Sequence, residues 1–239
     1  MVENLDLISI VAPVFNEKDN IAWTVDKIYK GVRPRFEIVM VYDFEEDNTL
    51  PMARKLQNEN RDIRLIKNKY GRGVMNAIRT GFEEAKGEIL VMMAVDRTDD
   101  PEVLNKMYEK IQEGFDIVCP TRYSKGGRTD ARLSMKSLLS RLAGISTPLI
   151  LGIPTSDLTY SYKMFRKEIL KKVKLESGDG FEFAEELVIK AHFKGYRIVE
   201  VPCVWKDRLY GKSKFKLMRW LPIYIKWYLL GIGLRLRIV

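Results

Sequence analysis

The regular alternation of short apolar runs with stretches of helical periodicity constrains the fold of this chain more than any other feature. The apolar runs have the length of strands buried on both faces, and the stretches between them repeat apolar residues every three or four positions. Strands are expected at residues 7–12, 36–42, 63–66, 89–95 and 117–120, and helices at 21–29, 50–57, 74–85 and 103–111. This pattern predicts an α/β fold with a mostly parallel central sheet and helices on both faces.

Polar residues stand at the ends of four expected strands. In such sheets ligands bind beyond the carboxyl ends of the strands, where this chain has residues 13–17, Asp43, Asp96 and residues 121–123. Any one of them could be ordinary loop chemistry, because Asp and Asn are favoured in turns and at helix N-termini. Four together favour a binding site. Asp43 and Asp96 each follow a strongly apolar run, and carboxylates combined with diphosphate oxygens suit Mg²⁺ or Mn²⁺.

A glycine-containing loop at residues 68–77 leads into an expected helix. It lacks the Gly-Lys-Ser/Thr of a phosphate-binding Walker loop and the third glycine of a dinucleotide fingerprint. It can be read as a plain strand-to-helix turn. The helix N-terminus and Arg72 would also favour an anionic ligand.

The positive charge of the chain is concentrated at its C-terminus. The net charge is +9, and residues 208–239 contain eight Lys or Arg and no Asp or Glu. Large aliphatic and aromatic residues are interleaved with these bases, which is typical of a helix lying in the headgroup region of a membrane. Nucleic acid is a poorer partner for this segment, because a nucleic-acid face does not need so many large apolar residues.

Two other readings of this segment stay open: a membrane-spanning helix, and a helix packed on the protein's own core. The apolar stretch at 217–234 is short for a span and contains Arg219, Pro222 and Lys226. A second apolar stretch at 138–153 follows Arg132 and Lys136, and could share one membrane-facing side with the first. A core helix broken at Pro148 is its alternative reading.

Several motifs, taken in order, resemble those of the family 2 nucleotide-sugar glycosyltransferases of the GT-A fold. They occupy residues 11–17, 41–43, 47–49, 71–73 and the Asp96 loop in the first half, and 121–123, 157–163, 180–183 with Glu186, 195–198, 200–202 and 207–214 in the second. The second set is similar to the dolichol-phosphate mannose synthase group, which moves a sugar onto a polyprenyl phosphate. The resemblance implies a GT-A catalytic domain over residues 1–210, followed by a basic amphipathic membrane-interface segment over 211–239.

The resemblance also implies roles for individual residues. Donor-binding positions are Pro13, Phe15, Glu17, Val41, Asp43, Val95, Asp96, Thr98 and Lys214, with Asp96 also facing a Mg²⁺ or Mn²⁺ ion. Positions around the acceptor phosphate are Arg122, Lys136, Ser140 and Arg208, and the catalytic positions are Asp96, Arg122 and Arg208. The partners implied are a GDP- or UDP-sugar, a polyprenyl phosphate and a membrane surface, with no nucleic acid.

The chain departs from the family pattern at two places. The Asp-any-Asp signature appears as Ala94, Val95 and Asp96, so one acidic group expected near the metal is absent. The usual Asp-Asp-Gly-Ser run appears as Tyr42-Asp43-Phe44-Glu45. These changes bear on the metal affinity and on the identity of the base or sugar, and they leave room for a catalytically weak, membrane-held nucleotide-sugar-binding module.

The chemistry of the acceptor decides whether a general base is needed. A polyprenyl phosphate is already an anion at neutral pH, with a second pKa of about 6, so it can attack the anomeric carbon directly and invert its configuration. A saccharide hydroxyl acceptor would require a carboxylate to take its proton, and Asp157, Glu185 and Glu186 are the candidates. Glu185 and Glu186 can equally be read as acids of a first helical turn.

The cellular compartment is suggested by two further features. Cys119 and Cys203 are the two cysteines, too few for a disulfide framework and typical of small core side chains in a reducing compartment. Residues 1–6 include two acids and lack a secretory pattern. We expect the protein at the cytoplasmic face of a membrane, either peripheral or partly inserted.

Overall fold

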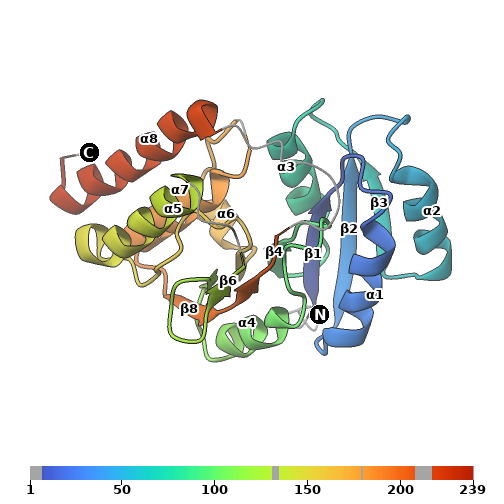
Figure 1. Cartoon of the computed structure of the whole chain (residues 1–239), viewed down its shortest axis with the longest axis horizontal. Coiled ribbons are helices and arrows are strands. Elements are labelled where there is room, and N and C mark those ends of the chain that lie inside the picture. Colours follow the sequence, from blue (N-terminus) through green and yellow to red (C-terminus); the bar gives the residue numbers. More distant parts are fainter. Residues whose placement is uncertain (1–6, 131–134, 179, 208–216, 239) are drawn as a thin grey trace.

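The computed structural model describes residues 7–130, 135–178, 180–207 and 217–238. Its centre is a sheet of seven strands in the order β3-β2-β1-β4-β7-β5-β8 (Figure 1). The strands are β1 Ile8–Pro13, β2 Phe36–Tyr42, β3 Ile63–Lys67, β4 Ile89–Met92, β5 Ile117–Thr121, β7 Met164–Arg166 and β8 Ile198–Pro202. The predicted α/β architecture with a mostly parallel sheet is confirmed.

The direction of the strands brings four carboxyl ends to one edge of the sheet. β1 pairs in parallel with β2 and β4, and β7 is inserted antiparallel between β4 and β5. Two antiparallel pairings in succession restore the direction, so β5 runs the same way as β1, β2 and β4. The polar residues that follow these four strands therefore share the edge that sequence reasoning selected.

Helices cover both faces because side chains alternate along each buried strand. In β1, Ile8, Ile10 and Ala12 belong to one core cluster and Val11 to the other. The first cluster includes residues of α1 Ile21–Gly31, α2 Leu50–Glu59 and α4 Val103–Gln112. The second includes residues of α3 Val74–Glu84, α6 Ile169–Lys172, α7 Phe183–Phe193 and α8 Leu217–Leu236.

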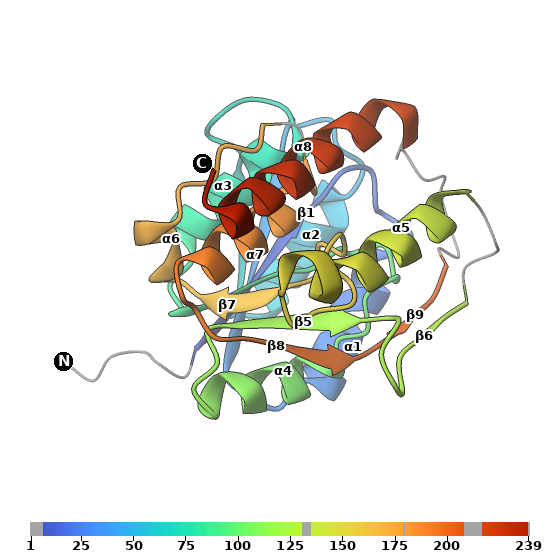
Figure 2. The ribbon, with the colours of Figure 1, turned by 90° about the vertical axis from the view of Figure 1, so that its left-hand side faces the viewer.

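The remaining elements are α5 Met135–Ser146, the π-helical turn η1 Thr147–Leu151, and a two-stranded sheet of β6 Arg128–Thr129 and β9 Val204–Trp205. Figure 2 shows α5 and α8 side by side on the same outer surface. The Tyr228 hydroxyl donates to Ser146 Oγ at 2.7 Å, and Arg235 donates to the Leu151 carbonyl at 3.1 Å. The two apolar stretches that the sequence associated thus lie together.

None of the helices in the described ranges combines the length and the apolar character needed to cross a bilayer. α8 is instead partly packed on the protein, with Trp227 only 3% exposed in the cluster that also contains α7 residues.

The expected and observed elements agree within one or two residues at most ends, and β4 is the informative exception. Sequence periodicity extended this strand to residue 95, whereas the strand ends at Met92. The Met93 N–H still donates to the Val11 carbonyl of β1 at 3.0 Å, but the next N–H, of Ala94, donates to the Asp99 carboxylate at 2.8 Å rather than to a neighbouring strand.

Candidate active site

The loop after β1 is fixed by side chains from the loop after β2. Asn16 has a φ of 58°, in the left-handed region, and its backbone N–H donates to both oxygens of Asp47 at 3.0 and 3.1 Å. The N–H of Glu17 donates to Thr49 Oγ1 at 2.8 Å. Asp47, 2% exposed, also accepts from the Thr49 N–H. These bonds hold the predicted donor-binding segment around Phe15 and Glu17 in one shape.

Asp43 fastens the glycine-containing loop. One carboxylate oxygen accepts from Asn68 Nδ2 at 2.8 Å and the other from the Gly73 N–H at 3.0 Å. Gly73 has a φ of 135°, a conformation that side-chain-bearing residues rarely adopt, which explains the glycine at this turn. The carboxylate therefore organises the loop before α3, and its predicted contact with a nucleoside stays a prediction.

An aromatic and cationic group lies at the ends of β1 and β2. Phe15 is 43% exposed and meets Phe44 edge to face, with ring centroids 5.6 Å apart. The Arg72 guanidinium lies 4.8 Å from the Phe44 ring centroid. Rings of this kind can stack a base, and the guanidinium suits an anion. Sequence reasoning selected Phe15 and noted Arg72. It recorded Phe44 only as a departure from the family pattern.

Asp96 lies in a constrained loop after β4. Its side chain is 4% exposed, and Oδ1 accepts from the Thr98 N–H at 3.1 Å and from Thr98 Oγ1 at 2.6 Å. Arg97 has a φ of 68°, and the Val95 carbonyl accepts from Thr24 Oγ1 at 3.1 Å. The predicted donor-binding positions Val95, Asp96 and Thr98 are thus held together as one unit.

Asp99 is a buried carboxylate that sequence reasoning missed. It is 5% exposed and accepts hydrogen bonds from the Ala94 N–H at 2.8 Å and from the Tyr160 hydroxyl at 2.6 Å. Burial, and then the negative charge of Asp96, raise the pKa of Asp99 to about 7. The available signal was the density of acids over residues 96–100. The decisive partner, Tyr160, comes from a distant part of the chain.

The residues present fit a divalent ion that shares its ligands with a substrate. No group of three or more His, Cys, Asp or Glu that could enclose a metal occurs within the described part of the chain. Asp96 with Thr98 offers hard oxygen atoms, and Mg²⁺ commonly binds through one or two carboxylates together with substrate phosphates and water. Asp96 is therefore a suitable protein anchor for such an ion.

Arg122, Asp157 and Ser140 form the second half of the edge. The guanidinium binds the carboxylate of Asp157 through Nε at 2.7 Å and Nη2 at 2.8 Å, and Nη2 also donates to Ser140 Oγ at 3.1 Å. The guanidinium carbon lies 5.1 and 4.9 Å from the ring centroids of Tyr123 and Tyr160. Burial alone would lower the pKa of Arg122, but the ion pair with Asp157 raises it above its usual value.

Gly144 allows α5 to approach this network. A Cβ on Gly144 would lie 2.0 Å from the Ser156 carbonyl oxygen, so only glycine permits this contact. The close packing carries Ser140 to Arg122, and the predicted acceptor residues Arg122 and Ser140 are brought together. Lys136 lies one turn earlier on α5, and its side chain is outside the described part of the structure, as are Arg208 and Lys214.

The three carboxylates considered as proton acceptors have different surroundings. Asp157 is paired with Arg122, and Glu186 accepts from the Glu176 and Ser177 N–H groups, from Ser177 Oγ and from Lys190. Glu185 is 1% exposed, and its Oε2 has no hydrogen-bond partner among the residues that the structure describes. Burial, and then the nearby charge of Glu182, raise the pKa of Glu185 well above its usual value.

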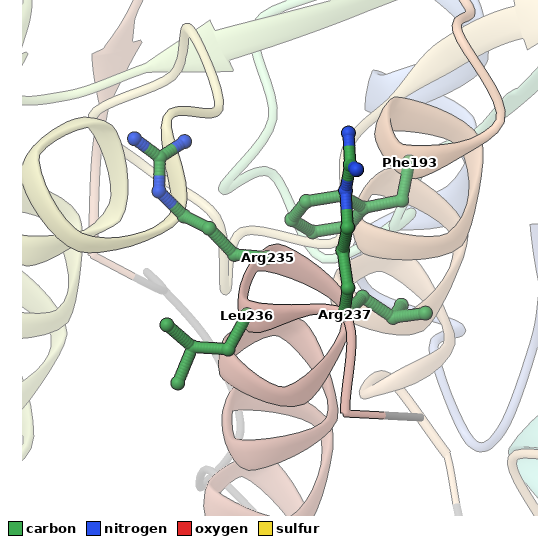
Figure 3. Close-up of a pocket in the computed structure, with 5 residues that line it drawn as sticks. Phe193, Arg235, Leu236 and Arg237 are labelled. Carbon is green, nitrogen blue, oxygen red and sulfur yellow. The ribbon is translucent and has the colours of Figure 1, made fainter.

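A shallow hollow lies at the far end of α8, away from the carboxyl edge. It is lined by Phe193 and residues 234–237, including Arg235 and Arg237 (Figure 3). In Figure 1 this end of α8 is separated from the ends of β1 and β2 by the width of α7 and α3. The hollow is thus distinct from the strand-end residues described above.

The sequence model of the family described as "Glycosyl transferase family 2" matches residues 9–174. A protein named dolichol-phosphate mannosyltransferase from Pyrococcus furiosus is 31% identical over 214 residues, which cover 87% of this chain and 59% of that protein. A protein named polyprenol monophosphomannose synthase from Mycolicibacterium smegmatis is 28% identical over 211 residues, covering 86% of this chain and 79% of that protein.

Solved structures agree on the fold. Glucosyl-3-phosphoglycerate synthase from Mycobacterium tuberculosis, crystallised with Mn²⁺, UDP and glucosyl-3-phosphoglycerate, superposes with a TM-score of 0.70. The superposition covers 95% of this chain and 80% of that chain at 17% sequence identity. The S. aureus protein TarS, over residues 1–349, superposes with a TM-score of 0.60 at 18% identity, covering 84% of this chain and 60% of that chain. These likenesses establish a GT-A fold.

Proposed function

The chain belongs to glycosyl transferase family 2, and we propose that it is an inverting transferase that moves a hexose, mannose or glucose, from a GDP- or UDP-sugar to a polyprenyl phosphate. The names of the two curated relatives, which specify dolichol-phosphate and polyprenol-monophosphate mannose products, support this acceptor. The chain spans 59% of the length of the Pyrococcus relative, so the activity of that whole protein is only proposed for this chain.

The donor is assigned to the ends of β1, β2 and β4. The nucleoside would contact Pro13, Phe15, Glu17, Val41 and Asp43, and the diphosphate would lie near Val95, Asp96, Thr98 and Lys214. Asp96 would hold a Mg²⁺ or Mn²⁺ ion, which when bound neutralises the charge of the diphosphate and of the departing nucleoside diphosphate. The fixed loops support this assignment, since a rigid site loses less entropy on binding.

The acceptor is assigned to Arg122, Ser140, Lys136 and Arg208. A phosphate oxygen of the lipid attacks the anomeric carbon, the bond from that carbon to the diphosphate oxygen breaks, and its electron pair leaves with the nucleoside diphosphate. No proton has to be removed, so no general base is needed. Arg122 orients and neutralises the acceptor phosphate, which would otherwise repel the donor diphosphate.

One observation supports a lipid as the acceptor: α5 connects the Arg122 network to exposed apolar side chains. Ser140 reaches Arg122 from the same helix that leaves Leu138 and Leu142 52% and 54% exposed. We define the outer face as the exposed large apolar residues of α5, η1 and α8, which are Met135, Leu138, Leu142, Ile145, Leu149, Ile150, Ile225, Leu229 and Leu236. Exposed apolar residues on neighbouring helices, one of which belongs to the basic C-terminal segment, fit peripheral or partly inserted binding to the cytoplasmic leaflet.

The experiment that tests this function uses the full chain, vesicles containing polyprenyl phosphate, and labelled GDP-mannose, UDP-glucose and related donors. We expect label in the lipid phase with Mg²⁺ or Mn²⁺ and little with EDTA. The matched control acceptor is the polyprenol without its phosphate, which should stay unlabelled. Transfer to saccharides instead would favour a hydroxyl-acceptor enzyme, and nucleotide-sugar binding without any transfer would favour a binding module. Either result would contradict the proposal.

A further inference from the structure

The loop that carries Asp96 has an alanine where the resemblance implies an acid, and the structure places another acid, Asp99, against the backbone of that alanine. The Ala94 N–H donates to the carboxylate of Asp99, at 2.8 Å. We propose that Asp99 is a positioning residue that replaces the missing acid, fixing the Asp96 loop and adding a second negative charge beside a divalent ion. This inference rests on the proposed function, because it concerns the metal that the donor diphosphate would share with Asp96.

The loop needs such a restraint because its backbone is strained. Arg97 adopts a φ of 68°, which costs a side-chain-bearing residue about 1 kcal/mol or more unless the surroundings impose it. The restraints lie on both sides of Arg97: Thr98 holds Asp96, and Asp99 holds the backbone at Ala94. Closing the loop from position 99 back to position 94 fixes the direction in which the Asp96 carboxylate points.

Asp99 also joins the donor side of the site to the acceptor side. Tyr160 donates to Asp99 Oδ1 at 2.6 Å, and the Arg122 guanidinium lies 4.9 Å from the Tyr160 ring centroid. Arg122 is in turn bound by Asp157. The Asp96 loop and the predicted acceptor arginine are therefore in contact through two intervening side chains.

Asp99 and Asp96 belong to one short loop, which the bond from the Ala94 N–H to the Asp99 carboxylate closes. Burial makes the negative form of Asp99 costly, and the charge of Asp96 adds to that cost. A divalent cation near both carboxylates would offset their mutual repulsion. Asp99 need not be a ligand, since its two oxygens already accept from the Ala94 N–H and the Tyr160 hydroxyl. Groups behind a metal ligand typically change metal affinity by about 10- to 100-fold.

The test is Mn²⁺ binding to the full chain in the presence of UDP or GDP, measured by the electron paramagnetic resonance signal of free Mn²⁺. We expect Asp99→Asn to weaken Mn²⁺ binding by about 10- to 100-fold. The matched control is Asp100→Asn, which removes the same charge one residue away at a side chain bonded to the Glu102 N–H. It should bind Mn²⁺ as the wild type does. Equal affinities for the two variants would overturn the proposal.

Two further variants separate charge from position. Adding Ala94→Asp to Asp99→Asn restores an acid at the place the family uses, and we expect it to recover at least tenfold in Mn²⁺ affinity. If the Mn²⁺ affinity does not recover, the proposal that Asp99 replaces the missing acid is overturned. Tyr160→Phe keeps both carboxylates and removes one hydrogen bond, and we expect a loss of about threefold. It serves as the deciding variant if thermal unfolding shows that Asp99→Asn does not fold, and an unchanged affinity would then contradict the proposal.

The outcome for the wild type distinguishes this inference from the proposed function. If the wild type transfers sugar and binds Mn²⁺, and the Asp99→Asn and Asp100→Asn variants bind Mn²⁺ with equal affinity, only the role of Asp99 is overturned. A wild type that neither transfers sugar nor binds Mn²⁺ with either nucleotide would overturn both.

Discussion

The carboxyl edge of the sheet and the outer face of α5, η1 and α8 differ in how far their side chains are buried and bonded. At the edge, Asp99 and Arg122 are largely buried and bound to several partners each. On the outer face, Leu149 is 76% and Leu229 58% exposed. At the edge, the polar side chains are already bonded to other groups of the chain. On the outer face, the apolar side chains would gain free energy only by being buried against another apolar surface. Chemistry and docking are thus assigned to separate side chains.

Asp96→Asn should have the largest effect and should act on the edge alone. It keeps the shape of the side chain and an oxygen for Thr98, and removes the charge proposed to hold the metal. We expect metal-dependent transfer to fall by about 10³-fold, or about 4 kcal/mol of transition-state stabilisation. Vesicle binding should not change. Asp100→Asn is the control, and wild-type transfer by Asp96→Asn would show that the metal assignment is wrong.

Arg122→Ala tests whether the edge depends on its buried ion pair. Asp157 has no exposed surface, and removing its partner leaves an uncompensated charge in the interior. We expect a loss of about 3–5 kcal/mol in the free energy of unfolding, measured by urea denaturation. Lys30→Ala breaks a pair whose side chains are 70% and 50% exposed, and should change that free energy by no more than about 0.5 kcal/mol. Similar losses for both would contradict the contrast.

Leu142→Glu combined with Leu229→Glu tests the outer face. Complete burial of one leucine side chain is worth about 1.5–3 kcal/mol. Because both leucines would insert only in part, we expect the wild type to bind anionic vesicles about 10- to 100-fold more tightly than the double variant does. Co-sedimentation with vesicles measures this difference. Nucleotide binding should be unchanged. Tyr29→Glu, at a residue of α1 that is 37% exposed, is the control, and an equal loss there would argue against a specific face.

The smallest effect is expected on thermal stability, from a buried acid in α7, the helix on which α8 packs. The folded-state pKa of Glu185 is raised, so its contribution to stability is complete below its unfolded value near 4.5 and is lost as pH rises toward the folded value. Glu185→Gln removes this loss. We expect its Tm at pH 8 to exceed that of the wild type by about 2–4 °C, the shift that about 1 kcal/mol produces in a domain of this size.

Glu186→Gln is the matched control at the next position and should have the opposite sign. Its carboxylate accepts from Ser177 and Lys190, and bonds to a charged acceptor are lost with the charge. Calorimetry at pH 8 should therefore show a lower Tm for Glu186→Gln than for the wild type. A Tm for Glu185→Gln below that of the wild type would refute the assignment of a costly buried charge.

The fold was largely predictable because burial dictates pattern. The apolar runs at residues 36–42 and 117–120 lie within strands at nearly the expected bounds, since strands covered on both faces must be apolar throughout. β4 was predicted too long because Val95 continues the apolar pattern. Its termination depends on Asp99, whose bond to the Ala94 N–H is not visible in periodicity.

The candidate site was predictable only in part. Asp43, Asp96 and Arg122 were selected because strand ends are local in sequence, and Ser140 because motifs resemble a family. The bond from Tyr160 to Asp99 joins residues 61 positions apart, and that from Arg122 to Asp157 joins residues 35 apart. No local signal encodes such pairings, because they depend on how the strands are ordered and how α5 packs.

The sequence alone therefore determined the layered α/β architecture, the edge of the sheet to inspect and the basic, apolar character of the C-terminus. These properties follow from side-chain polarity and its spacing along the chain. Tertiary structure decided which polar groups are bound to one another, that α5 and α8 share one exposed face, and that Asp99 stands beside Ala94. Those outcomes depend on distances between segments that are remote in sequence, which only packing can set.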